Sequence, residues 1–211
     1  MTCIIPARGG SKRLPGKNMR KLDGEFIINR VIRIAHESEI FDNIIVSTDS
    51  KQIADIVIGA TVSMRPESIS GDIPEDDVLK WTAHKYWALN ICRIYPFAVL
   101  LTPARIQNGY QEFIKGVHEN VHECQKYGHP PRRGFSLYWG YDYPFMVNTP
   151  TEELTSIYHD AATFMFSHVG TLDKSLAERN IKWIPVKEWE AQDLDDADDW
   201  HMLEMKWKGR K

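Results

Sequence analysis

Apolar residues recur along the first hundred residues in two alternating patterns. Short, nearly continuous apolar runs, typical of buried strands, occur at 2–6, 43–50, 61–66 and 91–101, with Pro96 breaking the last of them. Helical spacing of apolar residues occurs between these runs, at 26–38, 51–60 and 76–89. Strands that alternate with helices predict an α/β fold, with three layers and a mainly parallel central sheet.

The second half of the chain departs from this pattern. Between Gln125 and Pro150 the helical periodicity stops, and proline, glycine and aromatic residues crowd together. We interpret this stretch as an irregular loop followed by extended arms. Regular patterns return in two candidate strands and a last helix, at 160–167, 181–186 and 195–208. The sequence therefore predicts a single domain, 1–211, with an arm at about 125–157.

Two helical interpretations concern individual side chains. In the helix expected at 76–89, Trp87 falls on the same apolar face as Val78. In "GVHENVHEC", His118 and His122 are four residues apart, so on a helix they would share a face that could bind zinc, with Cys124 close by. No convincing fourth ligand is present, and a solvated polar helix face is the preferred interpretation.

Composition narrows the class of protein. The chain has 211 residues, 43% hydrophobic and 26% charged, with a formal net charge of -3, so no general electrostatic attraction to nucleic acid is expected. No apolar run approaches the roughly 20 residues of a membrane span. The first strand begins within three residues of Met1, which leaves no room for a signal peptide. Three scattered cysteines indicate reduced thiols in a cytoplasmic protein.

The loop after the first strand, in "IIPARGGSKRLPGKN", matches neither common nucleotide-binding pattern. Five residues separate Gly10 from Gly16, and Asn18 stands where a Walker A loop has its serine or threonine. The Rossmann fingerprint G-x-G-x-x-G is also absent, because the two glycines are adjacent.

The chemistry of anion binding is nevertheless present in this loop. Backbone amides near Gly9 and Gly10 can approach an anion closely, and Arg8, Lys12 and Lys17 supply positive charge. Ligands of parallel α/β sheets bind at the carboxyl ends of the strands, where this loop lies. The competing interpretation is a solvated basic turn.

Several motifs in their order along the chain resemble the cytidylyltransferases that activate nine-carbon acidic sugars. This family contains the CMP-sialic acid synthetases and their pseudaminic and legionaminic acid relatives. The resembling stretches are the loop itself, "FDNIIVSTDSKQIA", "RPESISGD", "YHDAATF" and "QDLDDADDW". The last two resemble the "HDAGQF" and "QDIDTPEDW" stretches of the pseudaminic acid branch.

The resemblance implies a Rossmann-like nucleotidyltransferase fold and a Mg²⁺-dependent reaction between CTP and a 2-keto sugar acid. The sugar's anomeric hydroxyl would attack the α-phosphorus, and pyrophosphate would leave. The implied nucleotide-binding residues are Ala7, Arg8, Gly9, Gly10, Ser11, Lys12, Lys17, Asn18 and Arg65. Arg8, Lys12, Lys17 and Asp195 are the catalytic candidates. A surface arginine is the competing interpretation of Arg65.

Asp193 and Asp195 are the metal candidates. On an extended segment, residues two apart point to the same side, so both carboxylates can reach one Mg²⁺. Alternatively, Asp195 or Asp196 only caps the last helix. Asp49 ends the second strand, and either a site role or an N-cap would explain it.

His159 and Asp160 are implied to contact the sugar, although a structural histidine is an equal alternative. The chain departs from the family where sugar is read: Ala162 and Thr163 replace the Gly and Gln of "HDAGQF". Phe97 and Val99, in "YPFAVL", likewise replace a hydroxyl residue and a proline at the nucleotide–sugar boundary.

Pseudaminic acid is the favoured sugar by branch resemblance alone. A nucleotidyltransferase for another acidic keto sugar, such as the eight-carbon Kdo, and a degenerate non-catalytic nucleotide- or sugar-binding protein stay open as alternatives. In the family, a segment comparable to the aromatic arm exchanges between two subunits. The resemblance therefore implies a cytoplasmic homodimer that binds CTP and an acidic sugar, and neither nucleic acid nor membrane.

Overall fold

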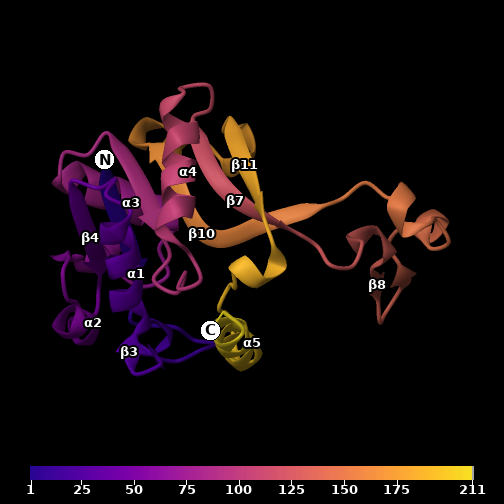
Figure 1. Ribbon diagram of the computed structural model, residues 1–211, viewed down its shortest axis with the longest axis horizontal. Helices are drawn as coiled ribbons and strands as arrows, with labels where there is room; N and C mark the ends of the chain where they lie inside the picture. The colour runs from indigo at the N-terminus through magenta and orange to yellow at the C-terminus, as the bar shows by residue number, and fades with distance from the viewer. Residues whose placement is uncertain (211) are drawn as a thin grey trace.

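A seven-stranded sheet forms the centre of the computed structural model, which describes residues 1–210 (Figure 1). Its strands, in spatial order, are β11 (Ile181–Val186), β7 (Asn120–Lys126), β10 (Tyr158–His168), β6 (Asn90–Ile94), β1 (Thr2–Ala7), β4 (Asn43–Thr48) and β5 (Thr61–Met64). All neighbours are parallel except β10, which runs antiparallel to β6 and β7. The expectation of an α/β fold with a mainly parallel sheet is confirmed.

Helices cover both faces of this sheet. They are α1 (Ile27–Glu37), α2 (Lys51–Ile56), α3 (Glu75–Lys85), α4 (Pro103–Ile114) and α5 (Ala197–Lys208). Alternating side chains of β1 show the two layers: Cys3 and Ile5 enter the core with α1 and α4, whereas Ile4 packs with Leu79 and Ala83 of α3. Two small hairpins complete the regular structure: β2 (Lys21–Leu22) with β3 (Glu25–Phe26), and β8 (Phe135–Ser136) with β9 (Gly140–Tyr141).

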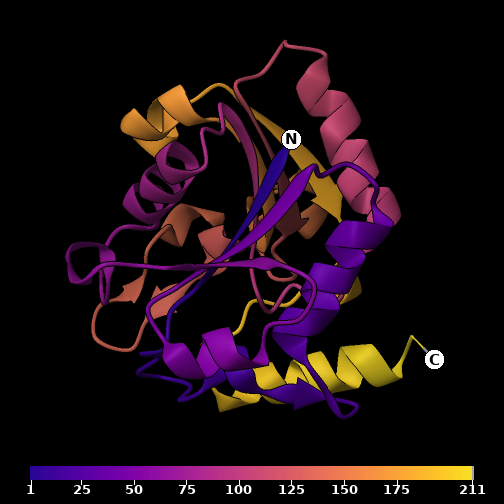
Figure 2. The ribbon, with the colours of Figure 1, turned by 90° about the vertical axis from the view of Figure 1, so that its left-hand side faces the viewer.

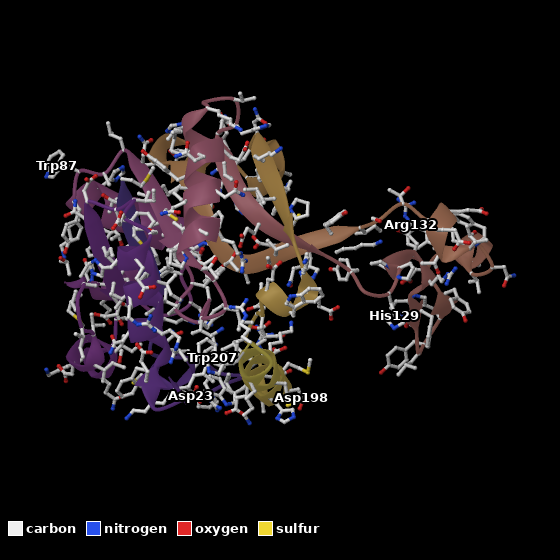
Figure 3. The ribbon with its side chains drawn as sticks, viewed as in Figure 1. Asp23, Trp87, His129, Arg132, Asp198 and Trp207 are labelled. Carbon is white, nitrogen blue, oxygen red and sulfur yellow. The ribbon has the colours of Figure 1, made fainter. Side chains whose placement is uncertain are left out.

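α5 lies along the lower edge of the domain, far in sequence from the elements it contacts (Figure 2). Leu203 is fully buried in the core, and the Trp207 indole donates a hydrogen bond to Asp23 in the first hairpin at 2.7 Å (Figure 3). The guanidinium of Arg30, on α1, lies over the Trp207 ring at 4.3 Å. These contacts hold α5 against the first hairpin and α1.

Three helical expectations are wrong. α2 ends at Ile56 and α3 at Lys85, so Trp87 lies beyond the helix with a φ of 56° and 91% of its surface exposed (Figure 3). His122 and Cys124 belong to strand β7 and are buried, while His118 precedes it and pairs with Asn180. A shared helical face for zinc therefore does not exist, and a solvated polar face does not describe His122.

The segment between β7 and β10 projects away from the domain, as Figure 1 shows around β8. This arm, residues 127–157, contains short 3₁₀ turns and the β8–β9 hairpin. Its apolar side chains are mostly exposed: Leu137 90%, Tyr138 91%, Trp139 74% and Phe145 76%. Figure 3 shows His129 and Arg132 on the same projection. The prediction of irregular loop and extended arms is confirmed.

Replacing Ala162 with glycine is expected to stabilise the fold. Ala162 has a φ of 51° in the irregular part of the β10–β7 pairing, between Asp160 and Met165. The left-handed conformation costs a non-glycine residue about 1–2 kcal/mol, and the greater freedom of glycine in the unfolded chain offsets about half of this. We expect Ala162→Gly to raise the free energy of unfolding by about 0.5 kcal/mol in a urea titration. A decrease of similar size would show that the bulge is not strained.

Candidate functional site

The loop after β1 is held against the rest of the domain by its own backbone. The Gly9 amide donates to Asp49 at 2.8 Å, and a Cβ on Gly9 would lie only 2.8 Å from the Cβ of Ser50. Glycine is therefore required for this close approach. The Asn18 amide group donates to the Arg8 carbonyl at 3.0 Å and closes the loop from its other end.

Asp49 ties two loops together. Its carboxylate accepts hydrogen bonds from the amides of Gly9 and Gly71, at 2.8 and 3.1 Å, and Arg65 lies 3.6 Å away. Burial opposes ionisation, but these amides and the Arg65 charge lower the pKa of Asp49. The helix cap is instead Ser50, whose hydroxyl accepts from the Ile53 amide. The N-cap interpretation of Asp49 is therefore wrong.

A cavity of about 230 Å³ opens beside this loop, at the carboxyl edge of the sheet. Its walls bring together four of the expected nucleotide-binding residues, Arg8, Lys17, Asn18 and Arg65. Its remaining walls are Pro6, Gly71, Ile73, Glu75, Val78, Tyr95, Pro96 and Phe97. The Asn18 side-chain oxygen is buried without a hydrogen-bond partner, which leaves it available to a ligand.

The cations differ in their surroundings. Arg8 and Lys12 are exposed and pair with Asp72, which the sequence places at the end of "RPESISGD". Arg65 is buried, contrary to the surface interpretation, and its Nε and Nη2 have no hydrogen-bond partner. Its ion-pair partner Asp49 lies 3.6 Å from Nη2, too far for a hydrogen bond, so these nitrogens are suited to an anion in the cavity. Gly10 and Ser11 continue the loop and do not line the cavity.

Lys17 ends a stack of side chains along the cavity wall. The guanidinium of Arg93 lies 3.8 Å from the Tyr95 ring, which stacks on Phe97 with 5.0 Å between centroids. The Lys17 ammonium lies 4.3 Å from the Phe97 centroid and donates to the Leu194 carbonyl. Burial lowers the pKa of Lys17, while Asp193 and Asp195 act in the opposite direction. Lys17 is therefore held between an aromatic face and a pair of acids.

Asp193 and Asp195 flank the residue to which Lys17 bonds. Asp195 pairs with Arg13 of the loop at 2.7 Å. The loop after β1 and the segment that carries the two acids therefore face each other. Asp196 caps α5, accepting from the amides of Asp198 and Asp199. The capping role therefore falls to Asp196, and Asp195 is left for other chemistry.

The acidic pair fits a divalent cation. Loss of solvent and the nearby Asp195 carboxylate raise the pKa of Asp193, which a bound cation would reverse. Mg²⁺ commonly takes one or two protein carboxylates and completes its shell with water and substrate phosphates. Within residues 1–210, no group of three or more His, Cys, Asp or Glu side chains is arranged to hold a metal. Any metal here would thus need further ligands from the substrate.

His159 and Asp160 line a different hollow, of about 570 Å³, whose walls come mainly from β7, β10 and β11. Its other walls are Cys124, Tyr158, Leu176, Trp183 and Pro185. Asp160 accepts from the Ala162 amide at 2.7 Å and lies 3.4 Å from Nδ1 of His122. The charge of Asp160 reaches Glu75 and Tyr95 of the first cavity, so the two hollows are neighbours.

The unusual residues at 97, 99 and 163 have structural explanations. Val99 is buried in the core, and Phe97 is only 5% exposed, with one face toward Lys17. The Thr163 hydroxyl donates to the buried Glu123 carboxylate at 2.6 Å. Neither Val99 nor Thr163 lines either hollow, so these departures leave both walls intact.

Glu75, Tyr95 and Ile73 are cavity residues that the sequence interpretation did not identify. Burial raises the pKa of Glu75, and the Arg93 charge opposes this. Tyr95 directly follows β6, so the rule that ligands bind at carboxyl ends of parallel strands could have indicated it. No comparable signal marks Glu75.

In the part of the chain that the structure describes, no helix is long and apolar enough to span a membrane.

Comparison with known proteins gives a consistent result. The family model described as "Cytidylyltransferase" matches residues 2–131, more than half of the chain. The pseudaminic acid cytidylyltransferase of Campylobacter jejuni is 30% identical over 177 residues, covering 78% of this chain and 76% of its own. The CMP-N,N'-diacetyllegionaminic acid synthase of Legionella pneumophila is 51% identical over 72 residues, or 33% of this chain and 31% of its own.

A solved structure shares the fold. CMP:2-keto-3-deoxy-manno-octonic acid synthetase complexed with CTP superposes with a TM-score of 0.75, covering 100% of this chain and 99% of its own, at 16% identity. At this identity the likeness concerns the fold alone. The Rossmann-like nucleotidyltransferase architecture expected from the sequence is thereby confirmed.

Proposed function

The chain belongs to the cytidylyltransferase family, and on that premise we propose that it transfers CMP from CTP to a nonulosonic acid and releases pyrophosphate. The observation that carries this proposal is the cavity that gathers Arg8, Lys17, Asn18 and Arg65 beside the acidic pair. A triphosphate has the charge that this cavity is built to hold.

We assign the residues around the cavity two roles, stabilisation of charge and positioning of the loop. The sugar's anomeric oxygen forms a bond to the α-phosphorus, and the bond to the bridging oxygen of pyrophosphate breaks. Negative charge then grows on pyrophosphate, where Lys17, Arg8 and Arg65 stabilise it because they are fixed before reaction. Asn18 and the Gly9 turn hold the loop so that these charges need not rearrange. Binding both substrates in line supplies much of the remaining rate.

Magnesium dependence is part of the proposal. Asp193 and Asp195 would hold the ion, which when bound neutralises phosphate charge and orients the α-phosphorus. The Arg13–Asp195 ion pair and the Lys17–Leu194 hydrogen bond bring this acidic stretch against the loop after β1, which supports the proposal that the two carboxylates would hold a cation there.

The acceptor is proposed to be a pseudaminic-type nonulosonic acid. Relatives named pseudaminic acid cytidylyltransferase support this choice, and the hollow lined by His159 and Asp160 lies next to the nucleotide cavity, where an acceptor is needed. Aromatic side chains at Tyr158 and Trp183 suit the apolar face of a sugar ring. The test must separate this function from transfer of CMP to Kdo and from binding without catalysis.

Pyrophosphate release tests this function. Each of the four nucleoside triphosphates is supplied with Mg²⁺ and a panel of nine- and eight-carbon keto sugar acids, with Asp195→Ala as the control. We expect release only with CTP and a nonulosonic acid, and none in the variant or after chelation. Release with Kdo alone would change the acceptor. If no acceptor gives pyrophosphate release but CTP still raises the melting temperature, the protein binds the nucleotide without catalysis.

We further propose that the protein is a homodimer formed through the arm. Four large apolar side chains of this arm are at least 74% exposed, more than an isolated arm in water favours. Trp139→Glu is expected to raise the dimer dissociation constant at least about 30-fold, measured by sedimentation, because aromatic anchors dominate interfaces.

Trp87→Glu is the matched control for the arm. Trp87 is 91% exposed at the opposite end of the molecule (Figure 3), and its replacement should leave the dimer unchanged. A monomeric wild-type protein at micromolar concentration, or equal effects of the two variants, would contradict dimerisation through the arm.

A cytoplasmic location completes the proposal. Cys3, Cys92 and Cys124 are buried and unpaired, which supports a reducing compartment.

A further inference from the structure

The segment that carries the acidic pair is held by side chains. Residues 187–196 connect β11 to α5 and are not part of the sheet. Gln125 donates to the carbonyls of Lys187 and Glu188, both at 3.1 Å, and Lys206 donates to that of Ala191 at 2.9 Å. Because backbone polar groups need partners when buried, these side chains decide where the segment lies.

Arg105, on α4, contacts the same segment at Glu190, one residue before Ala191, whose carbonyl Gln125 reaches at 3.4 Å. Its Nη1 donates to the Glu190 carbonyl at 2.6 Å and to that of Leu100 at 3.3 Å. Glu190 precedes Asp193 by three residues, and the intervening Ala191 is buried. Arg105 therefore holds the backbone of the segment at a point three residues before Asp193.

The orientation of Arg105 is itself fixed. Its Nε and Nη2 form a two-point ion pair with the buried Glu123, and Thr163 donates to the same carboxylate at 2.6 Å. A planar guanidinium held at two points can aim its third nitrogen in only one direction. Lysine at this position would keep the charge but could not make the forked contact.

We propose that Arg105, oriented by Glu123 and Thr163, is a positioning residue that fixes residues 187–196 opposite the loop after β1. This inference rests on the proposed function for its consequence, the affinity of the Asp193–Asp195 pair for Mg²⁺. It also assigns a role to Thr163, whose hydroxyl holds the Glu123 carboxylate that orients Arg105.

Arg179 provides a matched control. Its side chain is 2% exposed, against 15% for Arg105, and it forms an ion pair with Asp76 and donates to the carbonyls of Lys174 and Leu172. None of its contacts involves residues 187–196. Arg105→Lys and Arg179→Lys therefore each remove a guanidinium that links a carboxylate to backbone carbonyls, and only the first removes it from residues 187–196.

Two measurements on the full-length protein test the proposal. Hydrogen exchange of residues 187–196 without metal should be about tenfold faster in Arg105→Lys and unchanged in Arg179→Lys. Calorimetric titration of Mg²⁺ into protein with CTP, without acceptor, should give a dissociation constant about tenfold higher in Arg105→Lys alone. Thr163→Val should show both effects to a smaller extent.

The outcomes separate this proposal from the proposed function. Equal exchange and equal Mg²⁺ affinity in the two lysine variants would overturn the positioning role, whatever the enzyme does. If exchange rises only in Arg105→Lys but the wild-type protein binds no Mg²⁺, the hold on the segment stands and the metal-dependent function fails.

Discussion

Lys17→Met is expected to lower kcat/KM for CTP about 1,000-fold, mostly through kcat. The Lys17 ammonium is the cavity cation closest to the acidic pair, bonded to the Leu194 carbonyl between Asp193 and Asp195. In the proposed reaction its charge would act on the phosphate oxygens, where negative charge grows. Methionine keeps most of the side-chain volume beside Phe97 and removes the charge. Steady-state pyrophosphate release measures the effect.

Lys51→Met is the control for this prediction. Lys51 is an exposed lysine that pairs with Asp55 one helical turn away, so its loss should change neither activity nor stability measurably. A loss of less than about tenfold in Lys17→Met would be too small for a direct transition-state contact. Arg8 and Arg65 would then be the main source of charge at the phosphates.

Asp193→Asn is expected to have opposite effects on activity and stability. Activity should fall about 100- to 1,000-fold, because a metal contact is worth several kcal/mol of transition-state stabilisation. The amide oxygen can still accept from the Leu194 amide, as the carboxylate does at 2.7 Å. The backbone of the segment should therefore stay in place.

Stability without metal should change in the opposite direction and depend on pH. Lost solvent and Asp195 raise the pKa of Asp193, so the wild-type protein loses stability as pH rises through that pKa. Asparagine never ionises. Asp193→Asn should accordingly melt higher than wild type above this pKa, and the difference should disappear below the ordinary aspartate value.

Asp198→Asn is the control for the acidic pair. Asp198 is an exposed acid in the first turn of α5 (Figure 3), and none of its side-chain atoms contacts the cavity. We expect near wild-type activity. If thermal unfolding of metal-free Asp193→Asn shows no pH-dependent gain over wild type, the two carboxylates do not repel each other in the folded protein.

The sequence alone predicts the parts of this protein whose cause is local. Apolar runs predicted β1, β4 and β11 because each is a continuous strand with few polar interruptions. Adjacent glycines and cations also led us to expect anion binding at the loop after β1, where Arg8, Lys17 and Asn18 line one cavity. α4 was missed although Thr102 and Pro103 give a standard start signal, because its buried residues are few.

The rest depends on partners far along the chain. His122 and Glu123 are buried polar residues of β7, and their partners Asp160 and Arg105 lie 38 and 18 residues away. No spacing rule connects such positions, so the four-residue spacing of His118 and His122 favoured a helix face. The role of Asp49 stayed open for the same reason, because its two amide donors are 40 and 22 residues distant.

The clamp formed by Asp49 has a thermodynamic consequence for ligand binding. By joining the loops at Gly9 and Gly71, it orders both walls of the anion cavity when the chain folds. The backbone entropy of these loops is then lost once, at folding, and not again with each nucleotide. Association should therefore carry a small entropic penalty from the protein, leaving the heat of binding to reflect mainly the contacts made by the phosphates.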